Sequence, residues 1–238
     1  MKPYQKIPIK ECREPLVPIP LEKFTVVTPH PYQRLGAPYG DRSPYFVRQS
    51  VLQNLQQAQA LLQASHPSWH LHLFDAYRPI GVQQFMVDYT FNQIAADQGL
   101  SPTALNDSQR QHIQTRVDQF WASPSHNPAT PPPHSTGAAI DITLSDAHGT
   151  AVNMGSPIDE PSPRSFPSHF ADNCDPVEQA AHQNRQRLYR VMVKAGFCRH
   201  PNEWWHFSYG DQLWAWQQRE GREGIQDRAM PDARYGSI

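Results

Sequence analysis

The chain has 238 residues, which suits one compact domain, and its hydrophobic content of 38% is sufficient for a packed core. The formal net charge is −1 and no run of lysine or arginine stands out, so a nucleic-acid partner has no electrostatic support. No apolar run approaches the length needed to cross a bilayer, and we expect no membrane partner.

The N-terminus and the cysteines indicate the compartment. Prolines and charges interrupt residues 1–20, so no apolar stretch typical of a signal peptide is expected there. The three cysteines are odd in number and share no C-x-x-C spacing, which favours reduced thiols over a disulfide framework or a cysteine-based zinc site. The expected location is therefore the cytoplasm.

The first third of the chain predicts one long helix and one strand. Residues 1–42 are rich in proline, with short strands plausible only at 24–27. A helix is predicted from Ser43, which can cap it, through Pro44 in the first turn to residue 63. Its apolar face comprises Val47, Val51, Leu55, Ala58 and Leu62.

Alternating apolar residues in "SWHLHLFDAYRP" (68–79) predict a strand with one buried face, ending near Asp75. Pro79 then opens a helix that runs to about residue 97, and a further helix is expected from Asp107 to Trp121.

In the second half, 123–133 is predicted to be a loop and "AAIDITL" (138–144) a strand. Residues 145–175 lack periodicity, which indicates a long ordered loop or a lid. A helix should begin at Pro176 and end before Gly196. Two short strands are expected within 197–210, followed by a short helix at 211–219.

Helices and strands do not alternate strictly along the chain. This order favours an α+β fold, with a small, mostly antiparallel sheet and helices packed on one side, over a doubly wound parallel sheet. We expect a single domain over 1–238, with a proline-rich N-terminal segment at 1–42 and a loosely held tail at 220–238.

Two short motifs carry candidate metal ligands. "HSTGAAID" (134–141) places His134 seven residues before Asp141, and "EWWHF" (203–207) places Glu203 three residues before His206. Two imidazoles and one carboxylate form a three-ligand zinc site that leaves a position for water, and Glu203 would then act as general base. The spacing alone also permits a surface ion pair for Glu203 and an aromatic cluster around His206.

The two motifs resemble the zinc signature of the D-alanyl-D-alanine dipeptidases of the vancomycin-resistance type. That family lies within the zinc DD-peptidases, which share a fold with the Hedgehog signalling domain. Four further segments resemble the family and keep its order along the chain: "FDAYRP" (74–79), "NMGSPID" (153–159), "SH" (168–169) and "NRQRLYRVMVKAGF" (184–197).

The resemblance implies a set of roles. His134, Asp141 and His206 would bind one Zn²⁺ per chain, and Glu203 would be the catalytic base. Arg78 would stabilise the oxyanion of the tetrahedral intermediate, the alternative being a salt bridge with Asp75 or a helix cap.

Substrate contacts follow from the same resemblance. Asp159 would bind the ammonium of a small D,D-dipeptide. Ser135 is expected at the substrate, or with His169 in a second layer around the metal. Trp204 and Trp205 are expected to pack around the site and keep it dry.

Two departures from the family pattern concern the substrate rather than the metal. Pro132 stands where the family usually has a serine, which removes a possible hydrogen bond. The segment 29–46 resembles the family only loosely, so Tyr32, Tyr39 and Tyr45 all remain candidates for lining the pocket.

The expected activity is hydrolysis of D-alanyl-D-alanine to two D-alanines. The alternatives are a DD- or LD-carboxypeptidase acting on longer peptidoglycan peptides and a zinc-binding module without turnover. The oligomeric state remains open.

Overall fold

The computed structural model describes residues 2–122, 124–220 and 231–238. Its centre is a five-stranded sheet in the order β2-β4-β5-β7-β6. The β2–β4 pair is parallel and the other three pairs are antiparallel, which confirms the predicted α+β class with a mostly antiparallel sheet. The strands are β2 (Thr25–Val26), β4 (His70–Asp75), β5 (Ala139–Ser145), β6 (Cys198–Arg199) and β7 (His206–Ser208).

The side chains of the central strand β5 alternate between an apolar face and a polar face of the sheet. All seven of its residues are buried. Because successive side chains of a strand point to opposite faces, Ile140 and Ile142 lie on one face and Asp141 and Thr143 on the other. The apolar face meets helices, and the polar face carries the candidate site.

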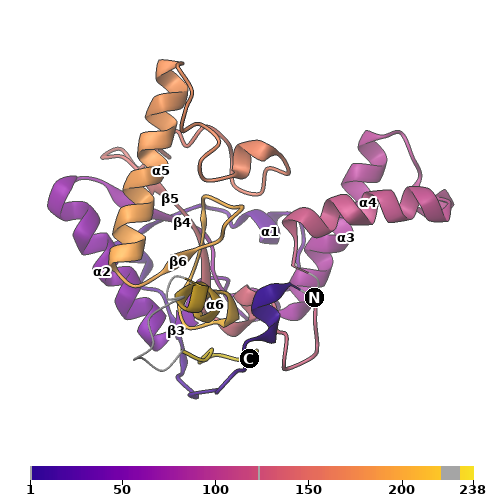
Figure 1. Ribbon diagram of the computed structural model, residues 1–238, viewed down its shortest axis with the longest axis horizontal. Helices are drawn as coiled ribbons and strands as arrows, with labels where there is room; N and C mark the ends of the chain where they lie inside the picture. Colours follow the sequence, from indigo (N-terminus) through magenta and orange to yellow (C-terminus); the bar gives the residue numbers. More distant parts are fainter. Residues whose placement is uncertain (1, 123, 221–230) are drawn as a thin grey trace.

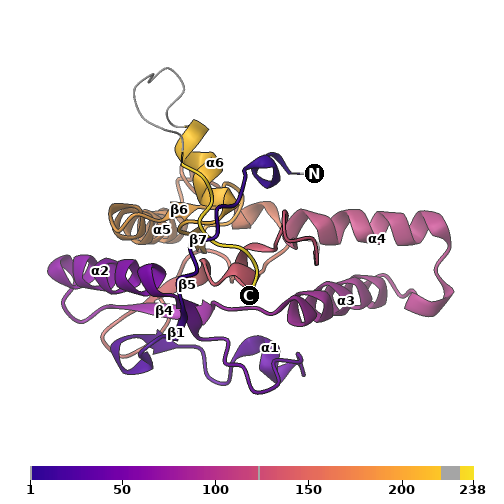
Figure 2. The same ribbon diagram turned by 90° about the horizontal axis from the view of Figure 1, so that it is seen from below.

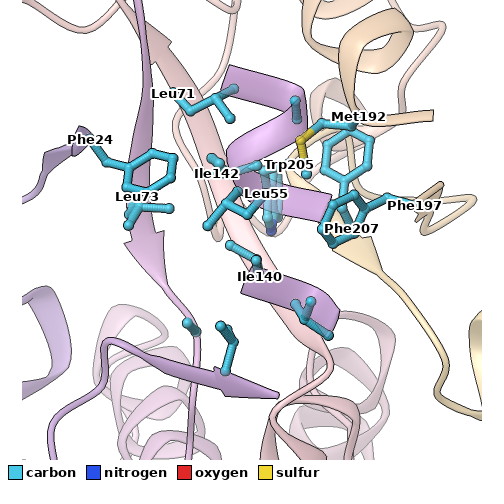
Figure 3. Close-up of a cluster of buried hydrophobic side chains, with 14 of the residues drawn as sticks. Phe24, Leu55, Leu71, Leu73, Ile140, Ile142, Met192, Phe197, Trp205 and Phe207 are labelled. Carbon is cyan, nitrogen blue, oxygen red and sulfur yellow. The ribbon is translucent and has the colours of Figure 1, made fainter. Parts of the chain in front are cut away.

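Two helices, α2 (Gln49–Ser65) and α5 (Pro176–Lys194), lie side by side against the apolar face (Figure 1). Leu55 from α2 and Met192 from α5 meet Ile142 of β5 in the main core (Figure 3). Each fully buried side chain of this kind contributes about 1.5–3 kcal/mol to the stability of the fold.

A second helix pair projects away from the sheet. Helices α3 (Ile80–Asp97) and α4 (Asp107–Phe120) pack on each other around their own apolar cluster (Figure 2). The Asn106 side chain caps α4 by accepting a hydrogen bond of 2.9 Å from the Gln109 amide. Both helices match the predicted ranges within a residue or two.

The start of α2 differs from the prediction. Residues Phe46–Arg48 form the strand β3, which pairs with β1 (Leu16–Pro18), so the helix begins at Gln49 and Ser43 does not cap it. The partner strand lies about 30 residues earlier in a proline-rich segment and gives no local signal. All five residues of the predicted apolar face are nevertheless buried. Four of them lie on the helix, and Val47 is buried as part of the strand β3.

The C-terminal residues 231–238 are packed rather than loosely held. Ala233 pairs with Ile9, and the fully buried Tyr235 donates a hydrogen bond of 2.9 Å from its hydroxyl to Glu14. The predicted loose tail is therefore wrong for this part, while 221–230 lies outside the described residues.

The remaining elements are short, apart from the nine-residue helix α6. They are η1 (Pro3–Lys6), η2 (Leu21–Lys23), α1 (Pro31–Arg34), η3 (Pro102–Ala104), η4 (Pro133–Thr136), η5 (Pro163–Ser165) and α6 (Gln212–Glu220). Across 2–122, 124–220 and 231–238, every helix is too short or too polar to span a bilayer.

Candidate active site

The sheet register brings the predicted metal ligands together. Asp141 on β5 lies directly opposite His206 on β7 and opposite Asp75 on β4, so all three occupy the polar face in one row. His134 comes from the turn η4, which Gly137 follows as its C-cap. Gly137 has φ of +72°, and an added Cβ would lie 2.6 Å from Leu16, so only glycine allows this entry into β5.

The three side chains form a compact donor set. One ligand atom from each of His134, Asp141 and His206 lies within 4.8 Å of the others. His134 Nε2 is 3.2 Å from Asp141 Oδ2, and His206 Nδ1 is 3.1 Å from Asp141 Oδ1. His134 Nδ1 donates to the Ala76 carbonyl at 2.7 Å, which leaves Nε2 as the lone-pair nitrogen that a metal needs. Two imidazoles and a carboxylate fit zinc.

The electrostatics of Asp141 also suit a cation. Burial opposes ionisation of this carboxyl, but His134 and His206 outweigh that effect and hold its pKa well below its usual range. Asp141 is therefore an anion at neutral pH. Two imidazoles and one anionic oxygen thus face a common point on the buried sheet surface.

Arg78 sits beside this donor set and is held by a buried carboxylate. Its Nε donates to Asp75 Oδ2 at 2.9 Å, and its Nη2 lies 3.3 Å from Asp141 Oδ2. Asp75 is fully buried and also accepts hydrogen bonds from the Tyr39 hydroxyl and from His30. Although burial opposes ionisation of Asp75, Arg78 lowers the pKa of this carboxyl. The structure thus shows the salt bridge with Asp75, and it places Arg78 beside the donor set, while its role at an oxyanion stays a prediction.

Glu203 lies close to the donor set but is not one of its three members. Its Oε2 lies 3.8 Å from His206 Nδ1, and its Oε1 lies 3.6 Å from His200 Nδ1. The side chain is 15% exposed. Burial, with the nearby charges of Asp141 and Asp159, raises the pKa of Glu203 to about 7. A carboxylate with this basicity can hold a proton and release it near neutral pH.

Asp159 enters the pocket from the long loop between β5 and α5. Its backbone has φ of +64°, an uncommon conformation for a residue other than glycine. The Tyr32 hydroxyl donates to Asp159 Oδ2 at 2.7 Å, and Arg78 Nη2 lies 3.1 Å from that hydroxyl. Burial and the Asp141 charge raise the pKa of Asp159 to about 7. Tyr32 is therefore the one of the three candidate tyrosines that directly contacts Asp159.

These groups line one small cavity of about 50 Å³. Six of the seven predicted site residues line it: Arg78, His134, Asp141, Asp159, Glu203 and His206. Pro132 and Trp205 also line it, while Trp204 is buried without lining it and donates from Nε1 to Ser156 at 3.0 Å. The expected packing role of the two tryptophans agrees with their burial.

Ser135 and His169 do not reach the cavity. The Ser135 hydroxyl donates to the Pro132 carbonyl at 2.8 Å, and His169 is exposed and packs on Phe170. The expectation that Ser135 binds substrate is therefore not supported.

Sequence reasoning missed several lining residues: Lys2, Tyr4, Gln83, Trp121 and His200. His200 had a local signal, since it precedes Glu203 by three residues in "RHPNE". The others come from segments distant in sequence, and no spacing connects them to the zinc motifs.

Comparison with known proteins agrees with this arrangement. A family model described as D-ala-D-ala dipeptidase matches residues 25–223. A D-alanyl-D-alanine dipeptidase of Synechocystis sp. is 52% identical over 226 residues, which cover 92% of this chain and 92% of the relative. One of Enterococcus faecium is 31% identical over 168 residues, covering 68% of this chain and 75% of the relative.

Among solved structures, VanYB in complex with D-alanine-D-alanine aligns with a TM-score of 0.46 at 15% identity, over 76% of this chain and 84% of that chain. The family match extends over most of the chain and includes both zinc motifs, and the Synechocystis relative is matched along nearly its full length. This chain therefore belongs to the D-ala-D-ala dipeptidase family of peptidases.

Proposed function

We propose that this chain is a zinc-dependent dipeptidase that hydrolyses D-alanyl-D-alanine to two D-alanines, with residues 1–238 acting as one catalytic domain. The observation that carries this proposal is the juxtaposition, in one small cavity, of a three-residue donor set, an adjacent carboxylate and a second carboxylate on the facing loop. The family membership supports the same reaction.

His134, Asp141 and His206 would hold the zinc ion through Nε2, a carboxylate oxygen and Nδ1. Zinc bound there would supply Lewis acidity toward a water molecule and toward the scissile carbonyl. The His206 ring is also held from its other side, because its Nε2 lies 3.3 Å from the Ser208 hydroxyl.

Glu203 would take the proton from the attacking water and deliver it to the nitrogen of the leaving D-alanine. Its distance from His206 suits this role, since 3.8 Å is close enough to reach a water at the donor set without itself being part of that set. Arg78 would face the oxygen on which negative charge develops, and Asp75 keeps its guanidinium fixed in that direction.

Asp159 would receive the free ammonium of the dipeptide. The Tyr32 hydroxyl fixes this carboxylate, so the ammonium-binding oxygen is positioned before substrate arrives. A free amine is what distinguishes a dipeptide from a longer peptidoglycan stem, in which the same nitrogen is an amide. The alternative carboxypeptidase activity requires Asp159 to tolerate that amide.

Removal of the metal tests the proposal most directly. Purified protein treated with a chelator is expected to lose D-alanyl-D-alanine hydrolysis, and addition of one equivalent of Zn²⁺ should restore it, because the donor set is the only source of Lewis acidity proposed here. Release of D-alanine is the measurement. Absence of turnover with zinc restored would leave the non-catalytic zinc module as the better reading.

Replacing Asp159 by asparagine tests the dipeptide selectivity. The Asp159→Asn variant should lose about 10- to 100-fold in kcat/KM for D-alanyl-D-alanine, because a charge-assisted contact is replaced by a neutral one. Hydrolysis of N-acetyl-D-alanyl-D-alanine, which has no ammonium, should change by less than about threefold by the same argument. If a tripeptide or pentapeptide is cleaved faster than the dipeptide by the parent enzyme, the carboxypeptidase alternative holds.

We also propose that the enzyme acts in the cytoplasm on free dipeptide. The state of the thiols supports this, because Cys12, Cys174 and Cys198 are all free.

A further inference from the structure

The N-terminal turn η1 forms part of the wall of the catalytic cavity. Lys2 and Tyr4 line that cavity together with His200 and Glu203. The turn lies beside α6 (Figures 1 and 2), and it is distant in sequence from the strands β5 and β7 that carry Asp141 and His206. A segment near the start of the chain therefore completes a site whose other residues come from 78–206.

The position of this turn is fixed by packing and hydrogen bonds. The Gln5 side chain accepts a hydrogen bond of 2.8 Å from the Lys2 amide, while the Gln5 amide donates to the Lys2 carbonyl at 3.1 Å. Tyr4 is only 7% exposed. Gln212 of α6 donates from Nε2 to the Ile7 carbonyl at 2.7 Å and to the Ala129 carbonyl at 2.9 Å, which ties the segment to the loop before η4.

The same residues separate the cavity from the outside. An outer groove of about 610 Å³ lies next to the cavity, and the two share Lys2, Tyr4 and His200 as lining residues. His200 Nδ1 is 3.6 Å from Glu203 Oε1, so this wall stands on the Glu203 side of the site. Asp159 instead contacts Tyr32, beside Arg78.

A dipeptide has an ammonium at one end and a carboxylate at the other. Asp159 is assigned to the ammonium, and the carboxylate still needs a cationic partner. Arg78 is already assigned to the oxyanion, and its guanidinium also contacts Asp75, Asp141, Gln83 and the Tyr32 hydroxyl. Lys2 also lines the cavity and is exposed. Within the part of the chain that the structure describes, its ammonium makes no ion pair or hydrogen bond, so this charge is available to a ligand.

The geometry of the proposed reaction determines on which side of the cavity the C-terminal carboxylate of the substrate must lie. Glu203 delivers a proton to the scissile nitrogen, and in the leaving residue only the Cα separates that nitrogen from the carboxylate carbon. A carboxylate so close to the protonated nitrogen must lie on the Glu203 side, where Lys2 is the available cation.

We propose that Lys2 is the receptor for the C-terminal carboxylate of the substrate, and that the turn η1 positions it for this purpose. The inference rests on the proposed dipeptidase activity and adds the group that recognises the second end of the substrate. The ammonium end is bound by Asp159 and the carboxylate end by Lys2, so both ends of the dipeptide must be free.

A substrate pair and a variant set test this assignment. Lys2→Gln is expected to lower kcat/KM for D-alanyl-D-alanine about tenfold, mainly through KM, because one charge-assisted contact is lost. It should leave kcat/KM for D-alanyl-D-alanine amide unchanged, since that substrate has no carboxylate. Lys2→Arg should retain most of the activity on the acid. Lys6→Gln, an exposed lysine of the same turn that does not line the cavity, is the matched control and should affect neither substrate.

An equal loss on both substrates, or no loss on the acid, would overturn the assignment while the parent enzyme still hydrolyses the dipeptide. No turnover by the parent with zinc present would instead refute the proposed function. Calorimetric titration of the zinc-loaded Glu203→Gln protein with the acid and with the amide then still tests Lys2, because the preference for the acid must disappear when Lys2→Gln is added.

Discussion

Replacing Glu203 by glutamine is expected to lower kcat for D-alanyl-D-alanine by about 10²- to 10⁴-fold while the protein still binds one zinc ion per chain. Glutamine keeps the size and the hydrogen-bonding oxygen of the side chain but cannot accept the proton of the attacking water. The donor set, His134, Asp141 and His206, is left intact because Glu203 is not one of its members. Release of D-alanine and metal content per chain are the two measurements.

A variant of a predicted metal ligand serves as the comparison that separates loss of the base from loss of the metal. Asp141→Asn removes the anionic oxygen between the two imidazoles and should lose both zinc and activity. Glu203→Gln should lose activity alone. A Glu203→Gln protein that no longer retains zinc would mean that Glu203 is itself a ligand, and the assignment of a general base would be wrong.

The parts of the fold that could be predicted from sequence are those with a local cause. The alternation of Leu71 and Leu73 with histidines marks β4, and α5 begins at a proline after the Asp175 cap and ends before a glycine with positive φ. Such signals lie within the element itself. The strand β3 and the packed C-terminal residues have partners more than 25 residues away, and nothing local announces them.

The residues of the candidate site also fall into those with a local sequence signal and those placed by tertiary packing. The metal ligands lie in two short motifs, and strand register then aligns Asp141 with His206 without further information. Ser135 was expected at the substrate from the family resemblance, but its hydroxyl donates to the Pro132 backbone carbonyl and it does not line the cavity. Lys2 and Tyr4 enter through tertiary packing against α6, which no motif encodes.

The second large effect is expected at Arg185, a buried arginine on α5 that holds the loop carrying Asp159. Its side chain is fully buried, and burial lowers the pKa of its guanidinium to about 10. Its nitrogens donate to the carbonyls of Met154 at 2.6 Å, Phe166 at 2.9 Å and Arg164 at 2.9 Å, and to the Ser156 hydroxyl at 3.0 Å. One side chain thus satisfies three backbone carbonyls of a loop that contains a single short 3₁₀ turn, η5.

Arg185→Met is expected to lower the free energy of unfolding by about 3–5 kcal/mol, because methionine fills similar space but removes four hydrogen bonds from a charged donor and takes from the Met154 carbonyl its donor. Urea unfolding of the zinc-loaded protein is the measurement. Variant protein that remains folded should also show a raised KM for D-alanyl-D-alanine, since Asp159 depends on this loop for its strained backbone conformation. Zinc content should not change, because the donor set lies on the sheet and on η4.

The control is Arg190→Met, an exposed arginine on the same helix, which should alter stability by less than about 0.5 kcal/mol. Since both variants remove one positive charge from α5, a difference between them measures the buried hydrogen bonds rather than the helix charge. A destabilised Arg185→Met enzyme with an unchanged KM would show that the loop keeps Asp159 in place by other contacts, of which the Tyr32 hydroxyl bond is the nearest. Parent-like stability would contradict the argument altogether, because four hydrogen bonds would then have been lost without cost.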